Sequence, residues 1–216
     1  MFTTAGKAPP SFALGLRSKM KSHASAIWRT SIRAAPPGAG SCAPRGIFTA
    51  SAVCAAFAAS ATSSEHLDFI EAILSGDLEL PGLTLDADLR WSLLQRLTAT
   101  GRAELDRIEA ELERDDTATG RRQAALARAA RPSPEAKALA WADAMERTDL
   151  PNALLDATIA GFVQPDQVEL LTPYRDRFFA EVVDAWNRQT MEMGQSIAMG
   201  LYPALLVDDE TIAATD

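Results

Sequence analysis

Helix-start residues alternate with amphipathic runs along most of this chain, and this alternation limits the kind of fold that it can adopt. Ser64 precedes a run in which apolar residues recur at helical spacing, and Gly76 ends that run. Asp86 can cap a second run, which stops at Gly101. The apolar positions of the two runs are Leu67, Ile70, Ile73 and Leu74, then Leu89, Leu93, Leu94 and Leu97. Alanine is abundant and runs of Val, Ile and Thr are scarce, so the sequence predicts helices rather than strands.

The same signals continue toward the C-terminus. Cap residues precede each later apolar run: Asp116 or Thr117, Ser133 with Pro134 at the first helical position, Asp149, and Thr172 with Pro173. The apolar positions at helical spacing are Leu105, Ile108 and Leu112; Ala138, Trp141, Ala142 and Met145; Leu155, Ile159 and Phe162; and Met193, Ile197 and Leu201. The set from Ala138 to Met145 is expected to be the buried side of its helix. The helix after Pro173 carries two apolar rows and is predicted to be the most buried: Tyr174, Phe178, Val182 and Ala185, with Phe179, Val183 and Trp186 beside them.

These runs predict an all-α fold for residues 64–216, in which antiparallel helix pairs stack as a HEAT-like curved solenoid. The expected helices are roughly 10–16 residues long and joined by short loops, which favours antiparallel neighbours. About 150 residues are enough to bury close to two thirds of the surface of the unfolded chain. This part can therefore hold a hydrophobic core of its own.

Residues 1–63 differ from the rest in charge and composition. Seven of the 21 basic residues and none of the 29 acidic residues lie before Glu65. The segment is rich in Ala, Ser, Gly and Pro and is predicted to be disordered. Three interpretations stay open: a targeting segment, an arm that binds nucleic acid, or a tract translated in the wrong frame. The apolar run at residues 50–59 is alternatively the first helix of the acidic domain.

Composition also limits the partners and the compartment. The seven basic residues form no dense patch and have no aromatic residues interleaved, so no nucleic-acid partner is expected. The run from Ile47 to Ala61 is too short for a membrane span of roughly 20 residues, so no membrane partner is expected. Cys42 and Cys54 make no disulfide framework, and the acidic domain has no cysteine, which favours the cytoplasm.

No catalytic, cofactor-binding or metal-ligating residue is predicted in this chain. A peptidase zinc site takes two His at positions i and i+4, a carboxylate ligand and a Glu base. The chain has two histidines, His23 and His66, and no His-Glu-x-x-His sequence. A nucleophile elbow and a glycine-rich phosphate loop are also missing from the sequence.

Several other residues could form sites, but their sequence context favours structural roles. The acidic cluster from Glu109 to Asp116 is expected to be a solvated helix face, and Asp208-Asp209-Glu210 to cap a final helix. Four residues are expected to serve packing rather than substrate contact: Arg90, Trp91, Trp141 and Trp186. His66 is expected at the surface.

A series of short matches resembles the C-terminal helical domain of the actinobacterial aminopeptidase N family, which are zinc metallopeptidases of the gluzincin type. The matching pieces occur in the family's order: Asp88-Leu89-Arg90-Trp91, Asp115-Asp116-Thr117, Ala130-Arg131-Pro132, Glu135-Ala136-Lys137, Leu150-Pro151-Asn152, Gly161-Phe162-Val163-Gln164-Pro165-Asp166-Gln167, Pro173-Tyr174 and Gly200-Leu201-Tyr202-Pro203. They cover residues from about Ser64 to Asp216.

The resemblance implies a domain that encloses the substrate while another domain holds the zinc, so that peptides are trimmed one residue at a time from the N-terminus. It also implies that the catalytic domain is absent here and that the helical stack is incomplete at its C-terminal end. We therefore expect a chain that is inactive alone, whose partners are peptides or a separate catalytic domain. The alternative is a stand-alone helical scaffold that binds a protein or peptide partner.

Overall fold

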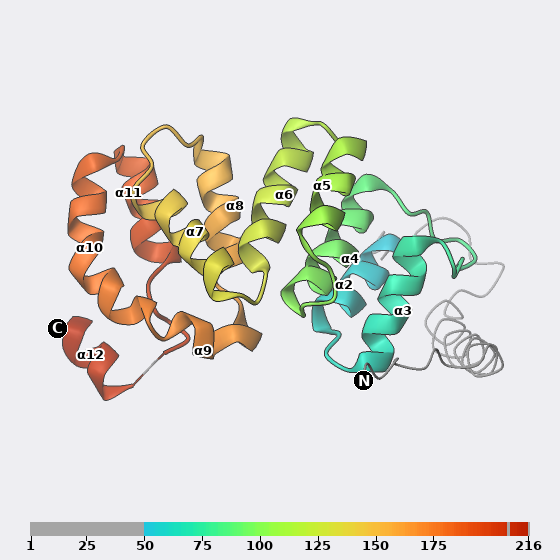
Figure 1. Cartoon of the computed structure of the whole chain (residues 1–216), viewed down its shortest axis with the longest axis horizontal. Coiled ribbons are helices and arrows are strands. Elements are labelled where there is room, and N and C mark those ends of the chain that lie inside the picture. The colour runs from blue at the N-terminus through green and yellow to red at the C-terminus, as the bar shows by residue number, and fades with distance from the viewer. Residues whose placement is uncertain (1–49, 207, 216) are drawn as a thin grey trace, which may run out of the picture. The chain divides into compact units, whose positions relative to one another are not determined.

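The computed structural model describes residues 50–206 and 208–215, and every regular element in these ranges is a helix (Figure 1). In chain order the helices are α2 (Ala50–Ser60), α3 (Ser64–Ser75), α4 (Ala87–Ala99), α5 (Leu105–Arg114), α6 (Ala118–Ala130), α7 (Pro134–Met145), α8 (Asn152–Phe162), the short 3₁₀ helix η1 (Pro165–Gln167), α9 (Val168–Leu171), α10 (Tyr174–Arg188), α11 (Met191–Gly200) and α12 (Asp209–Thr215). The predicted all-α class is confirmed.

Most of the predicted helix starts are confirmed by capping hydrogen bonds. The backbone N–H of Leu89 donates to the Asp86 carboxylate at 2.9 Å, and that of Ala136 donates to the Ser133 hydroxyl at 3.1 Å. Thr117 caps α6 in the same way. At α3 the cap is Ser63, so the helix begins at Ser64 and not after it. Each of these side chains satisfies one amide of the first turn that has no partner within the helix.

Two predicted caps are wrong. Asp149 does not cap α8; its carboxylate pairs with Arg147 at 3.0 Å, and the helix starts after Pro151 without a side-chain cap. Thr172 does not cap α10 either, because its backbone is already helical and its hydroxyl donates to the carbonyl of Val168 at 3.1 Å. In both places a nearer hydrogen-bond partner takes the side chain away from the helix start.

The helices pack in two sets. Helix α4 packs against α2 and α6, α6 packs against α8, and α8 packs against α11. Each member of a second set contacts the helix that follows it: α3 against α4, α5 against α6, α7 against α8, and α10 against α11. Figure 1 shows α8 beside α6, α6 beside α5, and α3 beside α4.

Buried side chains form two clusters that divide along α6. Ala124 and Ala127 of this helix belong to the first cluster with α2, α3 and α4, whereas Ala129 belongs to the second with α7, α8, α10 and α11. Helix α4 contributes the most buried residues, including Trp91. The prediction that α10 is the most buried helix is wrong, since Phe178 and Ala185 alone of its residues are buried and Val183 is 65% exposed.

The buried side of α7 also differs from the prediction. Trp141 and Met145 are buried as expected, but Ala138 is exposed and Ala142 is half-buried. Helix α7 is rotated so that the row of Lys137 faces α6 and α8. The other buried residues of α7 are therefore Ala136, Lys137, Ala140 and Ala144.

Residues 50–60 form helix α2, so the prediction of disorder up to residue 63 is wrong for this part. Cys54, Ala58 and Ala61 are buried in the first cluster, which matches the alternative interpretation of the run as a first helix. The rest of the predicted leader, residues 1–49 with His23 and Cys42, lies outside the described residues. Within the described ranges, no helix is both long and apolar enough to cross a membrane.

Candidate functional site

The segment from Gly161 to Gln167 lies where the ends of three helices meet. Gly161 sits against α6 so closely that a Cβ atom added to it would lie 2.1 Å from the Leu126 carbonyl oxygen and 2.8 Å from the Ala129 Cβ. A side chain at this position would force α6 and α8 apart. The glycine is therefore required for the contact between the two helices.

Gln167 and Asp166 connect the α6–α8 contact to α4 and, through Arg96, to the residue that follows α2. The Gln167 amide nitrogen donates at 2.8 Å to the carbonyls of both Ala99 and Ala130, the last residues of α4 and α6. Its amide oxygen is buried and has no hydrogen-bond partner among the described residues. Asp166 pairs with Arg96 at 2.8 Å, and Arg96 also donates to the carbonyl of Ala61 behind α2. Carbonyls that have no partner within their own helix are satisfied in this way.

Lys137 completes this junction from α7. Its side chain is fully buried, and Nζ donates at 2.9 Å to the carbonyls of Ala129 and Phe162, with a longer contact of 3.4 Å to Gly161. A cation at the C-terminal ends of α6 and α8 is favoured by the dipoles of both helices. Burial nonetheless lowers the pKa of Lys137 to about 8.

An aromatic cluster lies next to Lys137. Trp141 is buried between Phe162 and Tyr174, with ring centroids 5.7 and 5.0 Å away, and the guanidinium of Arg177 lies 5.2 Å from its ring. The Trp141 indole N–H donates to Glu181 at 2.8 Å. Burial opposes ionisation of Glu181, but the hydrogen bonds from Arg177 and Trp141 outweigh it and lower the pKa of this carboxyl group. Trp141 is a core residue, as predicted.

Trp186 does not follow the same prediction. It is 42% exposed on α10, and its ring lies over Gly194 of α11, where an added Cβ would be 3.0 Å from the ring. The apolar spacing on α10 is correct for a helix, but α11 covers the Trp186 ring only in part, at Gly194.

The acidic cluster from Glu109 to Asp116 differs from the prediction of a solvated helix face, because one of its acids is buried. Glu111 is buried and forms a two-pronged ion pair with Arg90, with a distance of 2.6 Å from Nε to Oε1. The buried Trp91 donates to the carboxylate of Asp115 at 2.9 Å. Arg90 and Trp91 thus have the packing role that was expected for them, and the acids that neighbour them in space share it.

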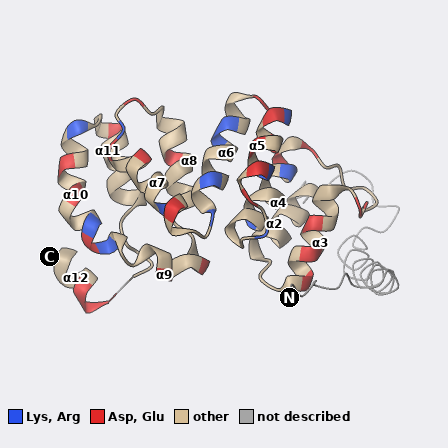
Figure 2. Cartoon of the chain, in the orientation of Figure 1, with Lys and Arg blue, Asp and Glu red and all other residues tan. Residues whose placement is uncertain are grey.

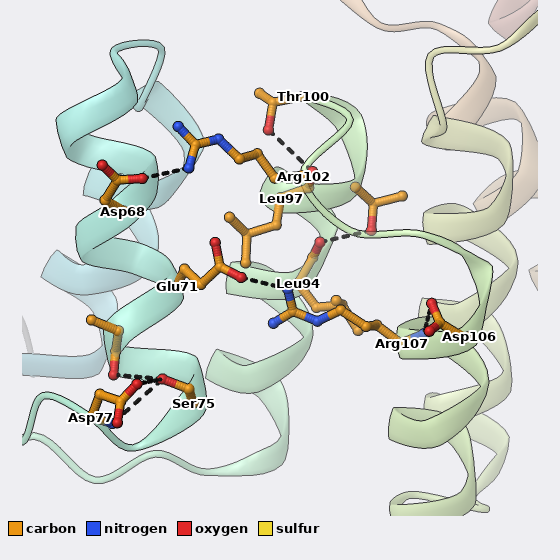
Figure 3. A network of polar contacts seen from close by, with 12 residues as sticks. Asp68, Glu71, Ser75, Asp77, Leu94, Leu97, Thr100, Arg102, Asp106 and Arg107 are labelled. Carbon is orange, nitrogen blue, oxygen red and sulfur yellow. Dashed lines mark hydrogen bonds and ion pairs between the residues drawn. The ribbon is translucent and has the colours of Figure 1, made fainter. Parts of the chain in front are cut away.

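A second set of ion pairs holds α3 to the start of α5. Arg102 pairs with Asp68, and Arg107 pairs with Glu71 at 2.9 Å (Figure 3). Both acidic residues lie on α3, whose exposed side is red in Figure 2. These pairs are partly exposed, so each contributes on the order of 0–1 kcal/mol to stability.

The described residues do not fit a peptidase zinc site. His66 packs edge-on against Phe57, with 5.1 Å between the ring centroids. Residues 50–206 and 208–215 bring together no group of three His, Cys, Asp or Glu side chains that could hold a metal ion. Cys54 is buried, and burial raises the pKa of its thiol, which disfavours the nucleophilic thiolate.

The C-terminal acids act as predicted at the last helix. The backbone N–H of Thr211 donates to the Asp208 carboxylate at 2.8 Å, and this bond helps to lower the pKa of Asp208. Arg175 of α10 pairs with Asp208 at 3.0 Å and with Glu210 at 2.6 Å. The acids therefore start α12 and also attach it to α10.

A hollow of about 550 Å³ lies between α8 and α11. Ile159, Ala160 and Val163 form part of its wall, and Asp156 and Glu192 add carboxylates that have no ion-pair partner among the described residues. The sequence predicts no site at this hollow. It also gives no sign of the roles of Lys137 and Gln167, whose partners are backbone carbonyls, or of Glu181, which accepts from Trp141 40 positions away.

Comparison with known proteins gives two matches. The model of the family described as the ERAP1-like C-terminal domain matches residues 14–216. An aminopeptidase N from Streptomyces lividans is 51% identical over 161 residues, which is 74% of this chain and 19% of that protein. The chain thus spans about a fifth of the length of this relative.

Proposed function

This chain belongs to the ERAP1-like C-terminal domain family, and from this membership we propose that it is the substrate-enclosing helical domain of a zinc aminopeptidase that trims residues from the N-termini of peptides. The single observation that carries the proposal is the match over residues 14–216, supported by 51% identity to an aminopeptidase N. The zinc and the catalytic groups belong to a separate catalytic domain, which is the proposed partner together with the peptide. Alone, the chain has no peptidase activity.

The packing order of the helices supports a HEAT-like stack as part of this proposal. Each of α4, α6 and α8 contacts its counterpart in the preceding and the following pair, which is how α-solenoid repeats build a continuous core. Such a stack presents one row of helices along one side. We assign the substrate to that row, where the hollow between α8 and α11 offers apolar walls and free carboxylates. We also place the chain in the cytoplasm, because Cys54, a cysteine of the described domain, is a buried free thiol, as is usual in a reducing compartment.

Two experiments test the proposal. In the first, the purified chain is incubated with zinc and an aminoacyl anilide, and neither stoichiometric zinc binding nor turnover is expected. In the second, the matching 161-residue segment of the Streptomyces aminopeptidase is replaced by the corresponding segment of this chain. The chimera is expected to keep aminopeptidase activity. A folded, zinc-loaded chimera without activity, or turnover by the chain alone, would contradict the proposal.

The second candidate function is a stand-alone scaffold for a protein or peptide. The same hollow favours it, because a volume of about 550 Å³ lies in the range of pockets that bind small ligands or side chains, about 300–1,000 Å³. Affinity purification separates the two candidates. A partner that carries a His-Glu-x-x-His sequence supports the peptidase, and a partner unrelated to peptidases supports the scaffold.

A further inference from the structure

A second groove is lined by other residues of α8 than the hollow between α8 and α11. It has a volume of about 410 Å³ and is lined by residues of α5, α6, α7 and α8 and of the loop before α8. Its apolar lining includes Leu112, Leu150 and Leu154, together with Leu139, which is 64% exposed. An exposed leucine beside a leucine-lined hollow is the arrangement that an apolar side chain of a ligand can cover.

Arginine is the most frequent charged residue in the lining of this groove, although the chain is acidic overall. The lining contains four arginines and one acidic residue, Asp143, whereas the whole chain has a net charge of −8. The arginines are Arg121, Arg128, Arg131 and Arg147. Helix α6 supplies two of these arginines and contains no acidic residue, as the blue segments of α6 in Figure 2 show. Acidic neighbours neutralise three of these arginines, so the unpaired positive charge of the groove comes from the fourth.

One of the four arginines has no carboxylate partner among the described residues. Arg121 pairs with Asp116, and Arg128 pairs with Glu109. Arg147 pairs with Asp149 and with Asp143 of the lining. Arg131, at the end of α6, makes one side-chain hydrogen bond, from Nε to the carbonyl of Arg128 at 3.3 Å. Its two terminal nitrogens are therefore available for a carboxylate, which is the group that fits the planar guanidinium best.

We propose that this groove is a docking site for an acidic segment of a partner protein that carries leucine-like side chains. The apolar side chain would cover Leu139 and enter the leucine-lined hollow, and an adjacent carboxylate would pair with Arg131. Because the chain as a whole repels anions, the unpaired Arg131 selects partners in which a carboxylate lies at the correct spacing from an apolar side chain. The proposal does not depend on the peptidase assignment, since it concerns a different surface.

The test uses the full chain and two fluorescein-labelled peptides, one of alternating Leu and Glu and one with every Glu replaced by Lys. Fluorescence anisotropy is expected to show binding of the Leu-Glu peptide, and no binding of the Leu-Lys peptide. The R131E variant should weaken binding at least tenfold, roughly the value of one charge-assisted hydrogen-bonded pair. The L139S variant should weaken it several-fold by removing apolar area.

R122E is the matched control, because Arg122 lies on the same helix outside the groove and its side chain contacts Thr119. It changes the net charge by the same amount and should alter binding by less than twofold. Equal losses in R131E and R122E, or equal binding of the two peptides, would overturn the proposal. It would also be overturned if neither peptide binds and L139S instead abolishes a dimer detected by sedimentation. Leu139 is exposed, so L139S tests the groove even if R131E folds poorly.

Discussion

At the scale of single residues, Lys137 offers the clearest measurement because it is the one lysine after residue 21. Its pKa is lowered to about 8 in the folded chain, below the ordinary value of 10.5. Between these values the unfolded chain holds a proton that the folded chain has released, so raising the pH stabilises the fold. Chemical denaturation at pH 7 and pH 10 should show the free energy of unfolding of the wild type rising relative to K137M by about 2–3 kcal/mol. A constant difference between the two proteins would show that Lys137 titrates normally.

Gly161 tests the close contact between α6 and α8. G161A should lower the free energy of unfolding by about 1–3 kcal/mol, because the added methyl group meets a backbone carbonyl that cannot move alone. G194A is the matched control. Its methyl group would meet the ring of the partly exposed Trp186, which can shift, and alanine is the better helix former. Equal losses in the two variants, measured by urea denaturation, would refute the argument from Gly161.

At the scale of helices, the sequence predicted starts and faces well where local hydrogen bonds decide them. Asp86 and Ser133 cap their helices because the side chain and the amide that it accepts are three residues apart. The prediction failed where a competing partner was near, as with Asp149 beside Arg147. It failed again for Trp186, since apolar spacing describes a helix face but does not say whether another helix covers it. Lys137 could not be foreseen, because backbone carbonyls leave no mark in the sequence.

Ion pairs from one side chain of α10 attach α12, beside single hydrogen bonds between Thr215 and Tyr202 and from Thr211 to Leu206. Arg175 pairs with Asp208 and Glu210, and α12 has a single buried residue, Thr211. R175Q should therefore release the helix, and hydrogen exchange should become faster over residues 209–215. The midpoint of global unfolding should stay within the error of measurement, since the core clusters are untouched. R122Q is the control and should leave exchange in this segment unchanged. If R175Q exchanges as the wild type does, the ion pairs are not what holds α12.

At the scale of the whole described part, stability depends on how two core clusters are joined. The first contains α2, α3 and α4, the second contains α7, α8, α10 and α11, and α6 contributes small alanines to both. Alanine contacts alone give little apolar area at this boundary. We therefore expect the polar junction to contribute much of the coupling between the clusters, because it joins the ends of α4, α6 and α8. It is made by Gln167, Lys137 and the Asp166–Arg96 pair.

Removing one part of this junction should uncouple the clusters. Q167A deletes the two hydrogen bonds that link Ala99 and Ala130, and it leaves both carbonyls unsatisfied at a cost of about 1–3 kcal/mol each at most. Differential scanning calorimetry should then show a van't Hoff enthalpy below the calorimetric one, or two resolved transitions, in place of a single cooperative transition. Q164A is the control, because Gln164 lies in the turn after α8 and its side chain donates to the carbonyl of Ala160 in the adjacent last turn of that helix. A single transition in Q167A, shifted to lower temperature without broadening, would mean that the α6–α8 contact couples the clusters by itself.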